Sequence, residues 1–152
     1  MWYDGSKMTK YCSDSDYGTV DNKTKLEAAD DAATANWGSD WCMPTNDQQR
    51  ELVNSSYTTT TWTTRNGVYG RYITSKMTGY TDKSLFLPAA GCRGGSSLGD
   101  AGSRGSYWSS ELGYDDSDDA WVLSFYSRNI NAGNSYNRCY GRSVRPVRTS
   151  AN

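Results

Sequence analysis

The clearest alternation of apolar and polar positions lies in residues 120–127, which read AWVLSFYS. Side chains of a β-strand point alternately to the two faces of a sheet, so this pattern predicts a half-buried antiparallel strand. We expect Trp121, Leu123 and Phe125 to face the core. The opposite face carries Val122, Ser124 and Tyr126.

Two short helices are predicted earlier in the chain. Residues 22–36 (NKTKLEAADDAATAN) place acidic residues near the start, continue through a run of alanine and stop at Gly38. Residues 47–53 (DQQRELV) follow Thr45 and Asn46, either of which can cap a helix.

Several short strands follow these helices. The patterns predict a strand or extended loop at 58–64, a turn at Asn66–Gly67, and strands at 69–77, 84–90 and 141–148. The glycine-rich residues 91–105 lack the Lys-Ser/Thr ending of a phosphate-binding loop, so we interpret them as a structural loop. Together these elements predict one α+β domain over residues 1–152.

The core is expected to be aromatic. Only 17 of the 152 residues are Val, Ile, Leu or Phe, but the chain has 6 Trp and 12 Tyr and a net charge of −1. Disordered chains combine few apolar residues with a large net charge, and this chain lacks the second property. We therefore predict a folded domain with a Trp- and Tyr-rich interior under a polar surface.

Composition also narrows the classes of function. The chain contains no His, which excludes Ser-His-Asp triads, Cys-His pairs and imidazole metal sites. The balance of 16 basic and 17 acidic residues argues against a nucleic-acid partner. No apolar run is long enough to cross a membrane, and the first residues have no apolar signal core. We expect no enzyme activity, no cofactor and no membrane insertion.

Two features leave alternatives open. The cysteines at 12, 42, 92 and 139 lie far apart without a CxxC pair, which favours free thiols over a zinc site and leaves one or two disulfides open for an exported protein. The acidic residues 115–119 could hold calcium, but they lack the Gly and the terminal Glu of an EF-hand loop. A solvated loop without a metal is the interpretation that we prefer.

Residues 112–142 have an unusual composition. They contain Trp121 but no Lys, Glu, Gln or Met, although these four types all occur in residues 1–111. Trp, Lys, Glu, Gln and Met are the five residue types that no codon ending in a pyrimidine can encode. The segment is instead rich in Tyr, Ser, Gly, Asn and Arg, which antibody-like surfaces use for broad contact and adaptable hydrogen bonding.

Six ordered motifs give the chain a family likeness: WGSDWCMPT (37–45), WTTRNGV (62–68), LFLPAAG (85–91), GSYWSS (105–110), AW (120–121) and SVRPV (143–147). In these motifs the chain resembles the Fibrobacter succinogenes major paralogous domain family of gut bacteria and their phages. That resemblance implies a C-type-lectin-like fold related to formylglycine-generating enzymes, here without the family's usual N-terminal strand. The calcium-binding motifs of sugar-binding lectins are absent, so fold likeness does not transfer their activity.

Some proteins with this signature look like targets of diversity-generating retroelements, which mutate adenine-containing codons near the end of the gene. The resemblance therefore implies a variable ligand-binding segment at about 112–142. On this hypothesis the contacts come from Tyr114, Asp116, Asp118, Asp119, Val122, Ser124, Tyr126, Arg128, Asn131, Asn134, Ser135, Tyr136, Asn137, Tyr140 and Arg142.

The leading hypothesis is a non-catalytic recognition module for a cell-surface protein or glycan, carried on a virion or a bacterial surface. The alternative is a structural or assembly domain, either a homo-oligomer or part of a larger structural protein. A third hypothesis is a degenerate relative of the formylglycine enzymes that keeps their catalysis.

Overall fold

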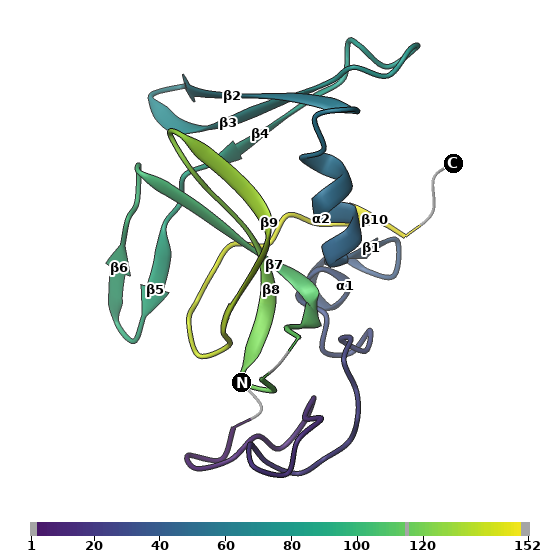
Figure 1. Ribbon diagram of the computed structural model, residues 1–152, viewed down its shortest axis with the longest axis vertical. Coiled ribbons are helices and arrows are strands. Elements are labelled where there is room, and N and C mark those ends of the chain that lie inside the picture. Colours follow the sequence, from purple (N-terminus) through teal and green to yellow (C-terminus); the bar gives the residue numbers. More distant parts are fainter. Residues whose placement is uncertain (1–2, 115, 150–152) are drawn as a thin grey trace.

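A computed structural model describes residues 3–114 and 116–149, and it confirms the α+β class. In this part of the chain, two helices of one to two turns accompany ten short strands, and the paired strands run antiparallel. Two of the sheets have three strands each; in Figure 1 one of them lies at the top and the other in the middle, with the N-terminal segment below.

The central sheet has the order β7-β8-β9, formed by β7 (Arg104–Leu112), β8 (Asp119–Tyr126) and β9 (Asn129–Asn137). The alternation in β8 is confirmed on its core side, because Trp121, Leu123 and Phe125 are buried. Helix α2 (Asn46–Leu52) packs against this inner face, as seen beside β9 in Figure 1.

The upper sheet has the order β2-β3-β4, formed by β2 (Thr58–Arg65), β3 (Val68–Ser75) and β4 (Ser84–Pro88). The predicted turn joins β2 to β3, with φ of 51° at Asn66 and 78° at Gly67. Positive φ at both central positions is the geometry that Asn-Gly tolerates in a tight hairpin.

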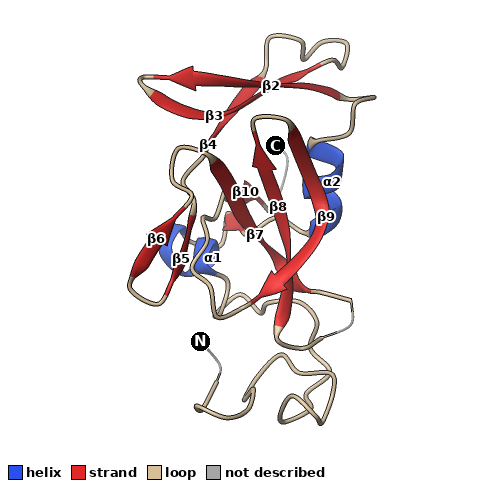
Figure 2. Cartoon of the chain, turned by 60° about the vertical axis from the view of Figure 1, so that its left-hand side comes forward, coloured by secondary structure: helices blue, strands red, loops and turns tan. Residues whose placement is uncertain are grey.

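Two small sheets complete the fold. The glycine-rich segment forms a hairpin of β5 (Cys92–Gly94) and β6 (Ser97–Gly99) that projects to one side in Figure 2. Strand β1 (Trp41–Cys42) pairs with β10 (Val147–Arg148) and brings the first and the last of the six motifs together. The predicted strand over 141–148 is therefore reduced to its last residues.

The core lies between the central sheet, helix α2 and the upper sheet. The Tyr107 ring stacks on Phe125 with centroids 6.0 Å apart, and Trp62 meets Phe125 edge-on at 6.4 Å. The expected Trp- and Tyr-rich interior is wrong: among the described residues, the buried Trp and Tyr side chains are Tyr11, Tyr107 and Trp121, and the core around Tyr107 and Phe125 is mainly aliphatic. Its buried members are Ile73, Leu87, Ala89, Tyr107, Leu123, Phe125 and Ala132.

The helix expected over residues 22–36 is wrong over most of its length, because α1 covers only Ala32–Trp37. Asp31 is the N-cap, and its carboxylate accepts hydrogen bonds from Ala33 N and Thr34 N. Residues 24–26 run along the edge of β7 instead, where Leu26 N donates to Ser110 O and Leu112 N donates to Thr24 O, and residues 28–30 form a turn. Bonding to the edge of β7 outweighs the local helix propensity.

The second helix is confirmed within one residue at each end. Thr45 is its N-cap, and Gln48 completes a capping box by accepting a hydrogen bond from Thr45 N at 2.9 Å.

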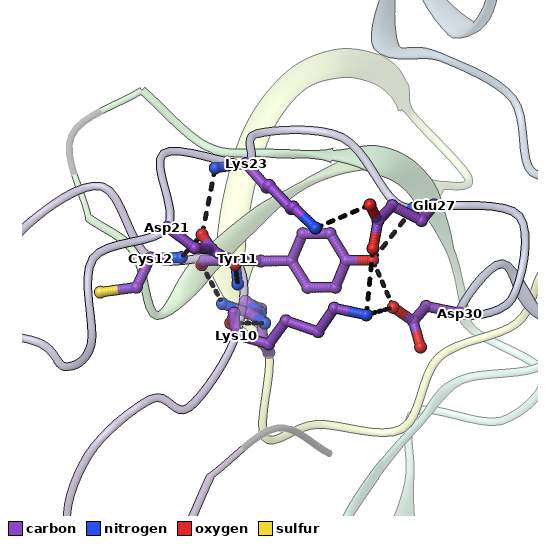
Figure 3. A network of polar contacts seen from close by, with 8 residues as sticks. Lys10, Tyr11, Cys12, Asp21, Lys23, Glu27 and Asp30 are labelled. Carbon is purple, nitrogen blue, oxygen red and sulfur yellow. Dashed lines mark hydrogen bonds and ion pairs between the residues drawn. The ribbon is translucent and has the colours of Figure 1, made fainter.

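An ionic network anchors the N-terminal segment (Figure 3). Tyr11 is 1% exposed; its hydroxyl donates to Asp30 and accepts a hydrogen bond from Glu27 N at 3.0 Å. Lys10 pairs with Asp30 and with Glu27, and Lys23 pairs with Glu27 at 2.7 Å. These contacts lower the pKa of the Asp30 carboxyl, with Lys10 as the larger cause and Tyr11 as the next.

Within the described residues, all four cysteines are free thiols, and no helix is long and apolar enough to cross a membrane.

Candidate functional site

The candidate site is the face of the central sheet opposite α2, which we call the outer face. Its members follow from the strand register, because residues directly opposite each other point to the same side of a sheet. Arg104 pairs with Tyr126 and Trp108 with Val122 across β7 and β8. The outer face consists of Arg104, Ser106, Trp108, Leu112, Ala120, Val122, Ser124, Tyr126, Asn129, Asn131, Asn134 and Tyr136.

Arg142 lies over this face from the segment that follows β9. Its guanidinium carbon is 4.5 Å from the Tyr136 ring centroid, 5.1 Å from that of Trp108 and 5.7 Å from that of Tyr140. Arg104 adds a second guanidinium over Tyr136 at 5.4 Å and donates to the Tyr136 hydroxyl at 2.6 Å. We call these five residues the arginine–aromatic cluster.

The backbone explains why Arg142 reaches the outer face. Ser143 N donates to Ser106 O at 3.1 Å and Trp108 N donates to Ser143 O at 3.0 Å, which binds this segment along the free edge of β7. The Arg142 guanidinium then donates to the Ser106 hydroxyl. Burial lowers the pKa of the Arg142 guanidinium, but an arginine stays charged at every physiological pH.

Two residues of the predicted variable set are not accessible, which corrects the expectation that they face a ligand. Val122 is 0% exposed and Ser124 is 7% exposed. Val122 lies in register between Trp108 and Asn134, and Asn134 Nδ2 donates to Ser124 Oγ at 3.3 Å. Larger neighbours and Arg142 cover the middle of the face, so these two side chains form its floor.

The exposed part of the predicted set lies around this floor. Tyr126 is 48% exposed, Tyr140 is 44% exposed, and Arg128 lies at the exposed turn between β8 and β9. Asn131 and Asn134 are half-buried on β9. Tyrosine, arginine and asparagine therefore meet solvent together on one side of the sheet.

The remaining predicted residues lie elsewhere. Ser135 pairs with Trp121, and Asn137 pairs with Asp119, so these positions belong to the inner side of the sheet. Ser135 Oγ donates to Asp119 Oδ2 at 3.1 Å. Tyr114 is 78% exposed and its ring meets Trp121 edge-on at 4.6 Å. The sheet thus separates the predicted set into two groups on opposite faces.

The acidic loop is tied to its neighbours by hydrogen bonds, and Asp116 remains exposed to solvent. Asp116 accepts from the Tyr17 hydroxyl at 2.5 Å, and Asp118 accepts from Asn137 Nδ2 at 2.6 Å. The bond to Asp116 raises the pKa of Tyr17 to about 12, and burial raises the pKa of Asp119. Among the described residues, no group of three or more acidic or cysteine side chains could hold a metal ion; Asp115 lies outside them.

The sequence did not point to two members of the arginine–aromatic cluster, Trp108 and Arg104, or to Ser106, which accepts a hydrogen bond from Arg142. Trp108 lies in the GSYWSS motif and outside the predicted variable segment, yet its ring meets Arg142. Arg104 and Ser106 lie in β7, which the glycine-rich pattern concealed. The available signal was the alternation in residues 104–108 (RGSYW), where Gly105 and Tyr107 face the core and their neighbours face outward.

Comparison with known proteins places most of the chain in one family. Residues 41–147 match the family model described as a domain of unknown function (DUF8237). This span begins in β1, ends in β10 and contains the whole outer face. No curated protein and no solved structure matches the chain.

Proposed function

The chain belongs to the DUF8237 family, and we propose that its domain is a non-catalytic recognition module whose outer face binds a cell-surface protein or glycan. The observation that carries the proposal is Arg142, whose guanidinium lies over the rings of Tyr136, Trp108 and Tyr140. Tyr, Trp and Arg are the residues that contribute most of the binding energy at interfaces.

The geometry favours binding over chemistry. Stacking against rigid neighbours reduces the rotamer freedom of the cluster before a partner arrives, so less entropy is lost on binding. Tyr126 and Tyr140 stand at its exposed rim, where each offers an apolar ring and a polar tip. Asn131 and Asn134 supply adaptable donors and acceptors on the neighbouring strand.

The test measures binding of the labelled full chain to a glycan array and to intact gut bacterial cells. We expect Tyr126→Ala and Tyr140→Ala to weaken any binding at least tenfold. Tyr80→Ala is the matched control, because Tyr80 is 61% exposed on the distant β3–β4 loop. Equal losses in all three variants, or none in the first two, would contradict an outer-face site.

We further propose a C-type-lectin-like fold diversified by a retroelement, on a virion or bacterial surface. The six ordered motifs and the composition of residues 112–142 support this proposal. The pairing of β1 with β10 near the two ends of the matched region is compatible with such a fold. Sequencing the locus tests the retroelement: a locus with neither a template repeat nor a reverse transcriptase would refute it.

A structural or assembly domain is the second candidate. The observation in its favour is that the upper sheet exposes a tyrosine on each face: Tyr69 is 50% exposed and Tyr72, on the opposite face, is 37% exposed. Sedimentation of the purified chain separates the candidates. An obligate oligomer that protects Tyr126 and Tyr136 from solvent would favour assembly and exclude an outer face free for another partner.

A further inference from the structure

The outer face carries positive charge without a matching negative charge. The chain as a whole is nearly neutral, with 16 basic and 17 acidic residues. Among the described residues that form the outer face, however, none is Asp or Glu, whereas Arg104 lies in β7 and Arg142 packs over the sheet. Arg128 adds a third guanidinium at the exposed turn between β8 and β9. The outer face is therefore a positive surface on a protein that is balanced overall.

Neither Arg104 nor Arg142 pairs with a carboxylate in the part of the chain that the structure describes. The ion pairs found there all use lysine. Arg104 donates to the Tyr136 hydroxyl, and Arg142 donates to the Ser106 hydroxyl. A charged side chain that is partly removed from water is ordinarily paired with an opposite charge. Both guanidiniums lack that partner within the described residues.

The two guanidiniums lie near the same aromatic ring. Their carbon atoms are 4.5 Å (Arg142) and 5.4 Å (Arg104) from the ring centroid of Tyr136. Burial lowers the pKa of Arg142, and the charge of Arg104 lowers it further. An arginine cannot relieve this repulsion by losing its proton at physiological pH. A ligand with a negative group beside both guanidiniums would relieve it.

Each guanidinium keeps a donor that reaches solvent. Arg104 Nη1 and Arg142 Nη2 donate to no group in the described part of the chain, and unlike Arg142 Nε they are not buried. Guanidinium groups bind the oxygen atoms of carboxylate, sulfate and phosphate groups through such paired N–H donors. The chemistry of the open donors therefore points to an anion.

A recess of about 270 Å³ borders the arginine–aromatic cluster and shares Arg142 with it. The recess lies between the β5–β6 hairpin and residues 141–143, and its wall also contains Arg93. Two backbone hydrogen bonds join these segments: Arg93 N donates to Gly141 O at 2.7 Å, and Gly141 N donates to Arg93 O at 2.8 Å. Its volume is near the lower end of small-molecule sites, which begin at about 300 Å³. The recess thus suits a compact acidic group, such as one acidic sugar residue, better than the broad surface of a folded protein.

We propose that the outer face binds an acidic glycan, whose carboxylate or sulfate group is held by Arg104 and Arg142. This inference rests on the proposed recognition function and names the class of its ligand. Arg93 adds positive charge at the recess. The exposed rings of Tyr126 and Tyr140 pack against neighbouring sugar residues, and their hydroxyls bond to sugar hydroxyls.

The test is calorimetric titration of the full chain with two matched pairs of probes. Oligogalacturonate carries carboxylates that are neutralised in its methyl ester, and dextran sulfate carries sulfates that dextran lacks. We expect the acidic member of at least one pair to bind at least about tenfold tighter than its neutral counterpart, the effect of a charge-assisted hydrogen bond. The pair that shows this preference identifies the anion. Raising the salt concentration from about 0.05 M to about 0.5 M should weaken the binding, because salt screens exposed charges.

Variants that each remove one positive charge locate the site. We expect Arg104→Gln and Arg93→Gln to weaken binding of the preferred acidic probe at least about tenfold. Arg65→Gln is the matched control, because it changes the net charge equally at an exposed position of the upper sheet. Thermal unfolding checks that each variant folds, and Arg93 is exposed, so its replacement should leave the midpoint unchanged. Equal losses in all three variants would show a response to net charge alone and would overturn the proposal.

Poly-L-glutamate separates an acidic glycan from an acidic peptide. If it binds as tightly as the preferred acidic glycan, the site recognises carboxylates on any chain and the glycan assignment is wrong. Equal binding of the acidic and neutral members of both pairs would also overturn the proposal. Binding to bacterial cells that needs Tyr126 and Tyr140 but not Arg104 would refute this inference and keep the recognition module. Absence of binding to cells and to every probe would refute both.

Discussion

The guanidinium carbon of Arg142 lies 4.5 Å from the ring centroid of Tyr136. The two residues are six positions apart in sequence and lie on either side of a turn. Strand β9 carries the ring, and the segment bound along β7 carries the guanidinium. The contact therefore joins opposite edges of the central sheet across its outer face, and it fixes the centre of the proposed binding surface.

Arg142→Ala should destabilise the fold by about 1–3 kcal/mol, because it removes the contacts with aromatic rings and leaves the buried Ser106 hydroxyl without its donor. Urea unfolding followed by tryptophan fluorescence measures this loss. Arg128→Ala, at an exposed turn, is the control and should change stability by less than about 0.5 kcal/mol. Equal effects of the two substitutions would show that the cluster does not stabilise the sheet.

Gly105→Ala should unfold or severely destabilise the domain, by about 3 kcal/mol or more. A Cβ at this position would lie 2.0 Å from Cζ of Phe125, which is 1% exposed in the core. Gly99→Ala is a matched control, because the nearest atom to its Cβ is a carbonyl oxygen 3.9 Å away. A Gly105→Ala chain with the thermal midpoint of the wild type would refute this packing.

Asp31→Ala should cost about 2–4 kcal/mol, more than the usual loss of a helix cap. The carboxylate, on a residue that is 5% exposed, accepts from Ala33 N, Thr34 N and Met43 N, so its loss leaves three backbone donors unpaired. Thr45→Ala, the N-cap of α2, is the comparison and should cost about 1 kcal/mol. Chemical denaturation of both variants measures the difference, and a smaller loss for Asp31→Ala would contradict the bond to Met43.

Acid should weaken the N-terminal anchor. Lys10 and Tyr11 lower the pKa of Asp30, so this carboxylate stabilises the fold fully above the ordinary Asp pKa of about 3.9. That contribution is lost as pH falls through the lower folded pKa. Asp30→Asn should therefore destabilise the chain near neutral pH, and its difference in stability from the wild type should shrink as the pH falls below about 3.9.

Unfolding midpoints measured across the acid range test this linkage. Asp82→Asn is the control, since Asp82 pairs only with the neighbouring exposed Lys83 among the described contacts. A stability difference between Asp30→Asn and the wild type that persists undiminished at about pH 2 would rule out the ionic origin of the effect.

Related copies of the gene should not vary equally over residues 112–142. We expect position 122 to stay small and apolar, because Val122 is 0% exposed and overpacking would cost stability. Positions 126 and 140 should vary freely, since both side chains are exposed. Sequencing such copies checks this pattern, and charged residues at position 122 in folded copies would refute it.

Local signals predicted several elements because their cause is local. Asn66–Gly67 forms the β2–β3 turn because these residues tolerate positive φ. Thr45 and Gln48 cap α2 through bonds within one turn. The alternation of β8 predicted its core side, since a strand against a core must bury one set of side chains.

Other elements depended on distant partners and could not be predicted locally. Residues 22–31 have the composition of a helix, yet Thr24 and Leu26 bond to the edge of β7. Strands β7 and β9 contain many small and polar residues, and their pairing with β8 makes them strands. Val122 alternates as an outward position and is buried by larger neighbours on the same face.

The sequence by itself determined the α+β class of the domain and the absence of histidine chemistry, because these follow from composition and from short-range periodicity. Only the tertiary structure decided which residues share a face. It separated Asp119 and Ser135 from Tyr126 and Tyr136, and it folded Arg142 back over β7. The physical reason is that the pleat of a single strand makes its side chains alternate between the two faces of a sheet. Which residues become neighbours on one face depends on the register between strands and on where later segments pack, and no local pattern encodes these.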